Sequence, residues 1–461
     1  MRPVEQVLTV AQMRGAEEGL IAAGSSVDAL MQVAGRGAAE WVWRVAGHHR
    51  VTVLCGPGNN GGDGYVIAEV IRERGGAVRV IAACEPKTEA ARKACALFGG
   101  EVLGPEAEVR GEVLVDCLFG SGLVRPLSDE HMALLTRLAG AHHRVIAIDL
   151  PSGIESDSGA ALNSGLPHNH LTIALGAWKQ AHFLMPAAAT MGALRLVGIG
   201  CAAVARAAGV VARPQLAAPA ADAHKYRRGL LAVLGGAMPG AAELACMAAQ
   251  GAGAGYVRLL AEGAARAPDL VIDPRRPAEA LADPRIGAVL AGPGLGRSDH
   301  ARVRLDAALA CGHPLVLDAD ALMLLQRGDK VASAIATPHE GELTVLERTW
   351  GLAGTGTKLD RARALAAVTG MIVLAKGPDN VIAAPDGRAA FAHRASSWLS
   401  VAGTGDVLAG IVASRLAAGA DGFTAACEGV WLHGEAARLA GPAFSASTLA
   451  AAVRSAYAAA L

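Results

Sequence analysis

Residues 56–68 read GPGNNGGDGYVIA and directly follow the apolar run VTVLC at positions 51–55. Five of the first nine residues are glycines, which let the backbone approach a ligand closely and adopt positive φ. An apolar run that ends in such a turn is typical of a parallel strand covered on both faces. A helix beginning near Gly64 would direct its free N–H groups toward an anion such as a diphosphate. The segment predicts an α/β fold with a ligand site at a strand end.

Similar runs continue along the first half of the chain. They are VRVIAA (78–83), VLVDCLF (113–119), VIAIDL (145–150) and LTIAL (171–175). Residues 10–46 are predicted to be helical, and the stretch SSVDALMQVAGRGAAEWVW (25–43) begins with a serine cap. This half is therefore predicted to be a Rossmann-like α/β sandwich.

A second series of runs follows a change in composition. Residues 202–223 contain many alanines, two prolines and no strand signal, so we place the domain boundary near residue 215. The predicted domains are residues 1–215 and 216–461, in keeping with the length of 461 residues. The second series is LLAVLGG (230–236), YVRLLA (256–261), DLVID (269–273), GAVLAGPGLG (287–296), PLVLDAD (314–320) and MIVLAKG (371–377). The stretch NVIAAPDGRAAFAH (380–393) then predicts a hairpin turning at Pro-Asp-Gly.

Composition excludes several function classes. Lys plus Arg and Asp plus Glu number 42 each, and aromatic residues make up 3%, so the sequence does not favour a nucleic-acid partner. No apolar run has the character of a membrane span or a secretion signal. The eight cysteines form no CxxC pair and most lie in apolar runs, which indicates buried free thiols in a reducing cytoplasm.

Two further strand ends in the first half are polar. VDCLFGSGLVRPL (115–127) places Asp116 at a strand end, and DLPSG (149–153) places Asp149 at the next. Ligands of open parallel sheets bind beyond the carboxyl ends of the strands. Each motif alone has an ordinary structural reading as a turn or a helix cap, but three on one sheet favour a binding site. The pattern matches neither GxGxxG nor a P-loop.

These motifs, with MRGAEEGLIAAG (13–24) and LMQVAGRGAA (30–39), resemble the NAD(P)HX epimerase domain over about residues 5–200. The resemblance implies a substrate, NADH or NADPH hydrated at ring carbon 6, whose R and S forms are interconverted. It implies a potassium ion held by oxygens of Asn60, Asp116 and Ser152. Asp149 would contact the ring and act as acid or base, provided that burial raises its pKa. The implied substrate pocket comprises Asn59, Asn60, Gly61, Gly62, Asp63, Gly120, Ser121, Gly122, Leu123, Val124, Arg125, Pro126 and Asp149.

The second half carries a different set of motifs. GTGD (403–406) precedes the helix-like VLAGIVASRLAAG, and a glycine turn at a helix N-terminus binds anions through backbone N–H groups. Asp406 in the first turn could accept a proton from an alcohol that attacks a phosphoryl group, although a plain helix cap has the same pattern. The companion motifs are AGPGLGRS (291–298), DADAL (318–322), TPHEGELTVL (337–346) and VLAKGPDNVI (373–382). Taken alone, His339 is better read as a structural histidine.

Together with HKYRRGLLAVLGG (224–236), these motifs resemble the ribokinase-like superfamily and, more narrowly, the ADP- or ATP-dependent NAD(P)HX dehydratase, over about residues 222–460. The resemblance implies that Asp406 is the catalytic base and that Mg²⁺ accompanies the nucleotide. The implied contacts to the hydrated substrate are Ala241, Gly294, His339 and Asp406. The implied contacts to ADP or ATP are Lys376, Gly377, Pro378, Asp379, Asn380 and Gly405.

The sequence departs from that family at two places. Met323 stands where the family commonly has Asn, and the stretch HRASSWLSVAGTGD (393–406) carries Trp398 and lacks the usual Asn-Pro pair. These departures affect the expected packing over the nucleotide and leave the anion site itself intact.

The preferred interpretation is a bifunctional repair enzyme, an isomerase and a lyase, acting on NADHX or NADPHX with ADP or ATP. We expect a homo-oligomer in the cytoplasm, with no nucleic-acid or membrane partner. One alternative is a ribokinase-like kinase for a vitamin or sugar with an accessory nucleotide-binding N-terminal domain. Another is a first half that binds nucleotide or partner but has lost catalysis. The retained Asp116, Asp149 and NNGGDG argue against that second alternative.

Overall fold

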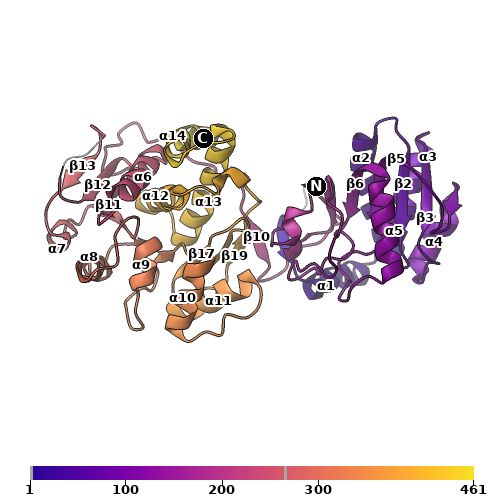
Figure 1. Cartoon of the computed structure of the whole chain (residues 1–461), viewed down its shortest axis with the longest axis horizontal. Helices are drawn as coiled ribbons and strands as arrows, with labels where there is room; N and C mark the ends of the chain where they lie inside the picture. Colours follow the sequence, from indigo (N-terminus) through magenta and orange to yellow (C-terminus); the bar gives the residue numbers. More distant parts are fainter. Residues whose placement is uncertain (1–3, 264–266) are drawn as a thin grey trace. The chain divides into compact units, whose positions relative to one another are not determined.

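The computed structural model describes residues 4–263 and 267–461. The chain divides into two compact units, Met1–Gly209 and Val210–Leu461 (Figure 1). Each unit is built on a sheet whose central strands are parallel, with helices on both faces, so the predicted fold class of two α/β domains is confirmed. Among the described residues, no helix has both the length and the apolar composition needed to cross a membrane.

The sheet of the first unit has the order β4-β3-β2-β5-β6-β7-β9, and every neighbouring pair is parallel. All five predicted runs form strands of this sheet. The sequence did not predict the two outermost strands. The strand β4 is only two residues long, and β9 alternates exposed and half-buried residues instead of forming a continuous apolar run. The strands are β2 (Val51–Cys55), β3 (Val78–Ala82), β4 (Val102–Leu103), β5 (Gly111–Cys117), β6 (His142–Ile148), β7 (Leu171–Leu175) and β9 (Ala193–Val197).

Helices cover the two faces of this sheet unequally. The helices α2, α3 and α4 pack on one face over apolar residues of β2, β5 and β6, and α5 packs on the other. The helix α2 begins at Val27 after the predicted serine cap, since the Ser26 side chain accepts the N–H of Ala29. The helices are α1 (Val10–Ala22), α2 (Val27–Ala46), α3 (Asn59–Glu73), α4 (Glu89–Leu97) and α5 (Asp129–Gly140), with the short 3-10 helices η1 (Gln180–His182) and η2 (Ala187–Ala189).

Three short strands lie outside the seven-stranded sheet and pair with one another. The strand β1 (Gln6–Leu8) pairs antiparallel with β10 (Ala208–Val210) and parallel with β8 (Trp178–Lys179). The prediction that residues 202–223 contain no strand is therefore wrong at β10. A three-residue strand made of Ala, Gly and Val carries no alternating pattern, so only its pairing partner defines it.

The helix after the glycine-rich turn begins earlier than predicted. The structure places the first residue of α3 at Asn59, not near Gly64, so all of NNGGDG forms the first helical turns. The glycines are needed there for close packing. A Cβ on Gly61 would lie 2.0 Å from the carbonyl oxygen of Gly56, and one on Gly62 would lie 2.5 Å from the Met31 side chain.

Gly56→Ala is expected to destabilise the first unit by about 1–3 kcal/mol, because overpacking forces the backbone to shift. Its Cβ would lie 1.8 Å from the backbone oxygen of Leu118. The matched control is Gly122→Ala, where a Cβ would meet nothing within 4 Å. Denaturant unfolding of the full chain, monitored by hydrogen exchange of peptides from β2, measures the stability of the first unit in both variants. Equal stability of the two would contradict the prediction.

The sheet of the second unit contains the parallel order β13-β12-β11-β14-β15-β16-β17, followed by the antiparallel strands β18 and β19. The predicted hairpin is confirmed. The strand β16 was not predicted, since it has only two residues. The strands are β11 (Leu230–Leu234), β12 (Tyr256–Leu260), β13 (Val271–Asp273), β14 (Ile286–Ala291), β15 (Leu315–Leu317), β16 (Ile335–Ala336), β17 (Ile372–Ala375), β18 (Val381–Ala383) and β19 (Ala389–Phe391).

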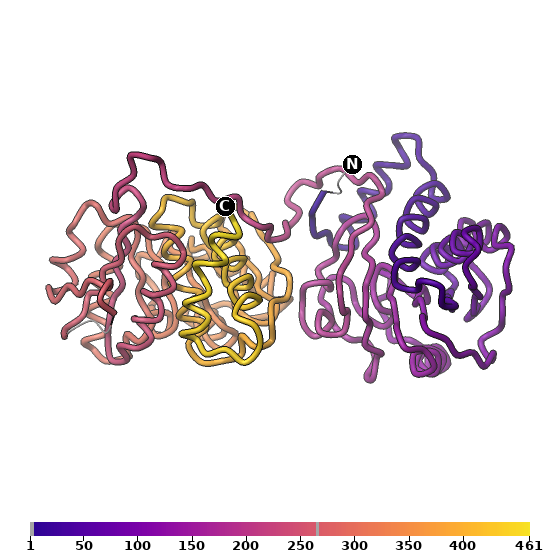
Figure 2. The backbone as a smooth tube through the Cα atoms, turned by 90° about the horizontal axis from the view of Figure 1, so that it is seen from above, coloured from indigo at the N-terminus to yellow at the C-terminus, as the bar shows by residue number. Residues whose placement is uncertain are grey.

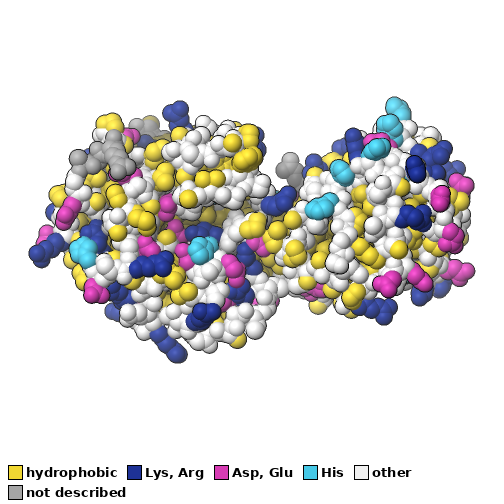
Figure 3. Space-filling model, viewed as in Figure 1, with side chains coloured by type: hydrophobic (Ala, Val, Ile, Leu, Met, Phe, Trp, Pro, Cys, Tyr) yellow, Lys and Arg dark blue, Asp and Glu magenta, His cyan; other side chains and the backbone are white. Residues whose placement is uncertain are grey.

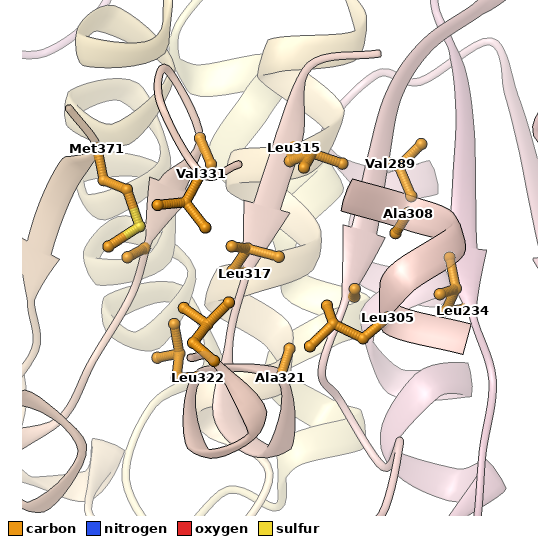
Figure 4. Packing of buried hydrophobic residues seen from close by; sticks show 14 of the residues in the cluster. Leu234, Val289, Leu305, Ala308, Leu315, Leu317, Ala321, Leu322, Val331 and Met371 are labelled. Carbon is orange, nitrogen blue, oxygen red and sulfur yellow. The ribbon is translucent and has the colours of Figure 1, made fainter. Parts of the chain in front are cut away.

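Helices cover both faces of this sheet. Figure 4 shows apolar side chains of β14, β15, α8 and α9 gathered on one face, and α6, α12 and α13 cover the other. The helix α14 packs against α6, α12 and α13, and Figure 2 shows the last helices in yellow side by side. The helices are α6 (Pro239–Gly251), α7 (Pro277–Ala280), α8 (Asp299–Ala310), α9 (Ala319–Leu324), α10 (Glu340–Trp350), α11 (Lys358–Thr369), η3 (Ser397–Leu399), α12 (Thr404–Ala417), α13 (Gly422–Ala440) and α14 (Ala446–Ala459).

The distribution of surface charge and the free state of the cysteines agree with the predictions from composition, whereas the predicted burial of the cysteines agrees only in part. Acidic and basic side chains intermingle over the face shown in Figure 3, as expected for equal numbers of each. All eight cysteines are free thiols. Four of them, Cys84, Cys95, Cys311 and Cys427, are only half-buried, so the prediction of burial is wrong for these.

Candidate active sites

The first unit contains a pocket of about 560 Å³ at the carboxyl ends of β2, β5 and β6. One wall is formed by helices α1 and α2, and it includes Arg14 and Glu17. The other wall is the sheet edge and its loops. The predicted residues that line the pocket are Asn59, Asn60, Asp63, Gly120, Ser121, Gly122, Leu123, Val124, Arg125 and Asp149. Gly61, Gly62 and Pro126 are not part of this lining.

Asp149 and Lys179 form a buried ion pair in this pocket. The Lys179 Nζ lies 2.5 Å from Asp149 Oδ1 and 2.6 Å from the carbonyl oxygen of Leu175. The Lys179 side chain is 1% exposed. Asp149 Oδ2 accepts the backbone N–H of Ser121 at 3.0 Å, which ties the glycine-serine loop to the pair. Sequence reasoning missed Lys179, since it lies in GAWKQ after β7, outside the quoted motifs.

This ion pair reverses one expectation about Asp149. Burial acts to raise the pKa of Asp149, but the Lys179 ammonium, its hydrogen bond and the Ser121 N–H outweigh burial and lower the pKa below its usual value. The condition under which Asp149 would carry a proton as an acid is therefore not met. An ionised carboxylate at this place can act as a base or as an electrostatic partner.

The backbone at Asp149 is held in an unusual conformation. Its φ is 66°, in the left-handed region that few non-glycine residues adopt. His182 holds it there: its Nδ1 accepts the N–H of Lys179 at 2.9 Å, which leaves the Nε2–H to donate to the carbonyl oxygen of Asp149 at 2.8 Å. Burial, followed by the Lys179 charge, lowers the pKa of His182 to about 4, so this imidazole is neutral. Strain of this kind is concentrated at functional sites.

A cluster of side-chain oxygen atoms, from Asn60, Asp116 and Ser152, lies in the same region of the first unit. The Ser152 Oγ donates to Asp116 Oδ1 at 2.7 Å and accepts the N–H of Phe119 at 2.9 Å. Burial raises the pKa of Asp116 more than its hydrogen bonds lower it. Both amide atoms of the Asn60 side chain are buried and lack a hydrogen-bond partner among the described residues. A cation that binds oxygen would satisfy Asn60 Oδ1 and compensate Asp116, so these residues fit a potassium ion.

In the second unit, the loops after five adjacent strands meet at one edge of the sheet. These strands are β11, β14, β15, β16 and β17, and they are neighbours in that order. Ala241 follows β11 and Gly294 follows β14, and the two are in contact, since a Cβ on Gly294 would lie 3.2 Å from the Ala241 Cβ. Asp320 fixes the glycine turn by accepting the N–H of Gly296 at 2.9 Å.

Asp318 and Lys376 form the charged centre of this edge. The Lys376 Nζ lies 2.5 Å from Asp318 Oδ1, which also accepts the hydroxyl of Thr337 at 2.7 Å. Burial acts to lower the pKa of Lys376, but Asp318 and Glu342 outweigh burial and raise it. A Cβ on Gly405 would lie 3.4 Å from this ammonium, so Lys376 lies directly beside the first turn of α12.

Asp406 is in the first turn of α12, as predicted. Burial raises its pKa to about 7, with Asp318 adding to the shift and Lys376 opposing it. The free N–H groups at the start of this helix provide positive partial charge beside the carboxylate. A carboxylate that titrates near neutral pH is suited to general base catalysis.

The structure places the remaining predicted residues in supporting positions. His339 caps α10, since its Nδ1 accepts the N–H groups of Gly341 and Glu342 at 3.0 and 3.2 Å. This agrees with the structural reading of His339, whose side chain is largely exposed. Asn380 closes the turn after Lys376 by accepting the N–H of Gly377 at 3.1 Å. Asp379 pairs with Lys358, a residue that sequence reasoning missed.

The atypical stretch before Gly403 is attached to α12. The Thr404 hydroxyl donates to the carbonyl oxygens of Leu399 at 2.8 Å and Val401 at 3.0 Å. Trp398 in η3 is 49% exposed. These two hydrogen bonds therefore hold the turn against the start of α12 in the absence of the Asn-Pro pair.

Comparison with known proteins covers both units. Residues 231–457 match the family model described as NAD(P)H-hydrate dehydratase, and residues 27–181 match the one described as YjeF-related protein N-terminus. A bifunctional NAD(P)H-hydrate repair enzyme of Gloeobacter violaceus is 34% identical, over 92% of each chain. One from Mycobacterium tuberculosis is 34% identical, over 80% of this chain and 79% of its own. The ADP/ATP-dependent NAD(P)H-hydrate dehydratase of Bacillus subtilis, co-crystallised with ATP/Mg²⁺, is 27% identical with a TM-score of 0.46, over 54% and 95%.

Proposed function

The chain belongs to the family of bifunctional NAD(P)H-hydrate repair enzymes, and from that membership we propose how its two units divide the work. The protein is an NAD(P)H-hydrate epimerase and an ADP/ATP-dependent dehydratase. We assign the epimerase to the first unit and the dehydratase to the second. The match of residues 231–457 to the NAD(P)H-hydrate dehydratase family carries the assignment, and each unit holds a lysine paired with an aspartate at the carboxyl edge of its sheet.

In the first unit, the hydrated nicotinamide ring would bind against Asp149, the loop at Ser121 and the helix wall. The ionised Asp149 would accept a proton during the inversion at ring carbon 6. Lys179 keeps that carboxylate ionised, and His182 holds its backbone in position. The N–H groups at the start of α3 would face the diphosphate, as the glycine-rich turn suggested.

A potassium ion is part of the proposal. Asn60, Asp116 and Ser152 would hold it, and it would supply positive charge that binds and orients the substrate. The unpartnered Asn60 amide and the buried Asp116 carboxylate support this proposal. The binding of the ion would leave Asp149 and Lys179 to carry out the proton chemistry.

In the second unit, Asp406 would take the proton of the hydroxyl at ring carbon 6. That oxygen then bonds to the terminal phosphorus of ADP or ATP, and the bond from this phosphorus to the departing nucleotide breaks. The C6–O bond next breaks with phosphate as the leaving group, and a proton leaves ring carbon 5. These steps restore the C5–C6 double bond of NADH or NADPH. The N-terminus of α12 would stabilise charge on the transferring group.

Residues 376–380 and Gly405 would bind the nucleotide, with Mg²⁺ on its phosphates. Lys376 supports this role because its ammonium lies beside the first turn of α12, where phosphate oxygens would meet the free N–H groups. Asp379 is occupied by Lys358, so it would act by holding the turn. Ala241, Gly294 and His339 would contact the hydrated substrate from the opposite side of the edge.

The test uses both epimers of NADHX with potassium, magnesium and either ADP or ATP, and follows the absorbance of NADH. Complete conversion with one nucleotide supports both activities and identifies the phosphoryl donor. Replacing potassium with sodium is expected to slow the conversion of the R epimer only. A phosphorylated product that accumulates without NADH would contradict the dehydratase and favour a kinase.

Dehydration is expected to depend on pH through Asp406. The base acts only when ionised, and its pKa of about 7 lies above that of an ordinary aspartate. The kcat/KM of dehydration should therefore rise about tenfold per pH unit below pH 7 and level off above it. The measurement is a pH profile at saturating nucleotide. A profile that is flat between about pH 5 and 8 would contradict Asp406 as the base.

Assembly into a homo-oligomer and residence in the cytoplasm complete the proposal. The alanine-rich helices would offer flat faces for self-association. Sedimentation of the purified chain and fractionation of cells that produce it test these two points.

A further inference from the structure

We propose that Glu17 is a second proton-transferring residue of the epimerase site, which protonates the hydroxyl at ring carbon 6 while Asp149 activates a water molecule on the opposite face of the ring. This inference rests on the proposed epimerase function of the first unit. It assigns a chemical step to a residue that lies in the motif MRGAEEGLIAAG but had no role in the sequence analysis.

The geometry of the pocket separates the two carboxyl groups. Glu17 is on α1, which forms one wall, and Asp149 is at the end of β6 on the sheet wall. Glu17 is half-buried and makes no hydrogen bond or ion pair with another described residue. A carboxyl group that faces a ligand pocket without a protein partner is available to the ligand.

The surroundings of the two groups favour opposite protonation states. Burial raises the pKa of Glu17, and the Asp149 charge adds to this rise, while Lys179 and Arg14 oppose it. Lys179 lowers the pKa of Asp149, as described above. Asp63 also faces this cluster, and burial followed by the charges of Asp149 and Glu17 raises its pKa. Two carboxyl groups whose pKa values are separated by their surroundings form an acid and base pair.

The step balances without an oxidant or reductant. The Glu17 proton passes to the hydroxyl oxygen, the C6–O bond breaks with its electrons on oxygen, and water leaves. The N1 lone pair forms an N1–C6 double bond in the resulting cation. Asp149 then takes a proton from a second water as the oxygen of that water bonds to the other face of C6, and the π electrons return to N1. Inverting glycosidases use two carboxyl groups in the same way.

The experiment measures the conversion of the R epimer of NADHX to the S epimer by the full chain without nucleotide. Glu17→Gln is expected to lower the kcat about 10²–10⁴-fold, with little change in KM. The matched control is Glu18→Gln, the next residue of α1, which is exposed and outside the pocket. Glu17→Asp keeps the carboxyl group and is expected to recover part of the rate. In ¹⁸O water, the wild-type chain should incorporate one heavy oxygen per inversion.

Each outcome has one meaning. A wild-type chain that does not interconvert the epimers overturns the epimerase function itself. A wild-type chain that interconverts them, with Glu17→Gln as fast as Glu18→Gln, overturns the role of Glu17 alone. Inversion without heavy oxygen overturns the step. Dehydratase activity of the same variants shows that each chain is folded in its second unit, and hydrogen exchange of α1 and β6 peptides shows it for the first.

Discussion

Asp406→Asn should abolish most of the dehydratase activity, with kcat about 10²–10⁴-fold lower than that of the unchanged chain. The substitution keeps the size of the side chain and removes the proton acceptor. The pKa of Asp406 lies near 7 because burial and the neighbouring Asp318 disfavour the ionised form. The measurement is NADH formation from the S epimer with ADP or ATP.

The same substitution should leave the fold intact. A raised folded-state pKa means that the protonated Asp406 contributes stability below the pKa of the unfolded chain, and this stability is lost as pH rises through about 7. At pH 8 the neutral asparagine should therefore give a Tm equal to or above that of the unchanged chain. The control is Asp299→Asn, an exposed aspartate in the first turn of α8, which should keep full activity. Equal activity of the two variants would contradict the assignment.

Lys179→Met should destabilise the first unit by about 3–5 kcal/mol, because removing one partner of a buried ion pair leaves the other charge uncompensated. Methionine fills most of the space of the lysine stem, so the loss reports the charge and not a cavity. Without the ammonium, the pKa of Asp149 should rise, because burial is then opposed only by weaker groups. Denaturant unfolding with hydrogen exchange of β6 and β7 peptides in the full chain measures the effect.

Two controls make this prediction specific. Lys93→Met removes an exposed lysine that pairs with Asp28 and Glu89, and it should leave the stability nearly unchanged because solvent screens exposed ion pairs. The double variant Asp149→Asn with Lys179→Met removes both charges and should recover much of the lost stability. A double variant as unstable as Lys179→Met would show that the pairing of charges is not the cause.

The contribution of the Asp149–Lys179 pair to the stability of the first unit also depends on pH. The folded-state pKa of Asp149 is lowered, so its contribution is present above the unfolded pKa and is lost as pH falls through the folded value. Acid should therefore loosen β6 and the loop at Ser121 before it affects strands without such a pair.

The sequence by itself determined the two α/β units, most central strands and the aspartates at their ends. Runs such as VTVLC and LLAVLGG carry this information, because a strand buried on both faces must be apolar throughout and its end must turn. Local sequence was also sufficient to predict a helix N-cap, as Ser26 at the start of α2 shows. Short strands such as β10 and β16 carried no such signal, because two or three residues define no period.

Tertiary structure alone decided the charge state of the site. Lys179 lies 30 residues beyond Asp149 in the sequence, and only the sheet and the β8 pairing bring its ammonium to that carboxylate. The sign of the pKa shift of Asp149 therefore could not be predicted from the motif DLPSG. Glu17 reached the same pocket through the position of α1. Motifs specify which groups are available at a strand end, but burial and charge partners from distant segments set their protonation, because electrostatic interaction depends on distance in space.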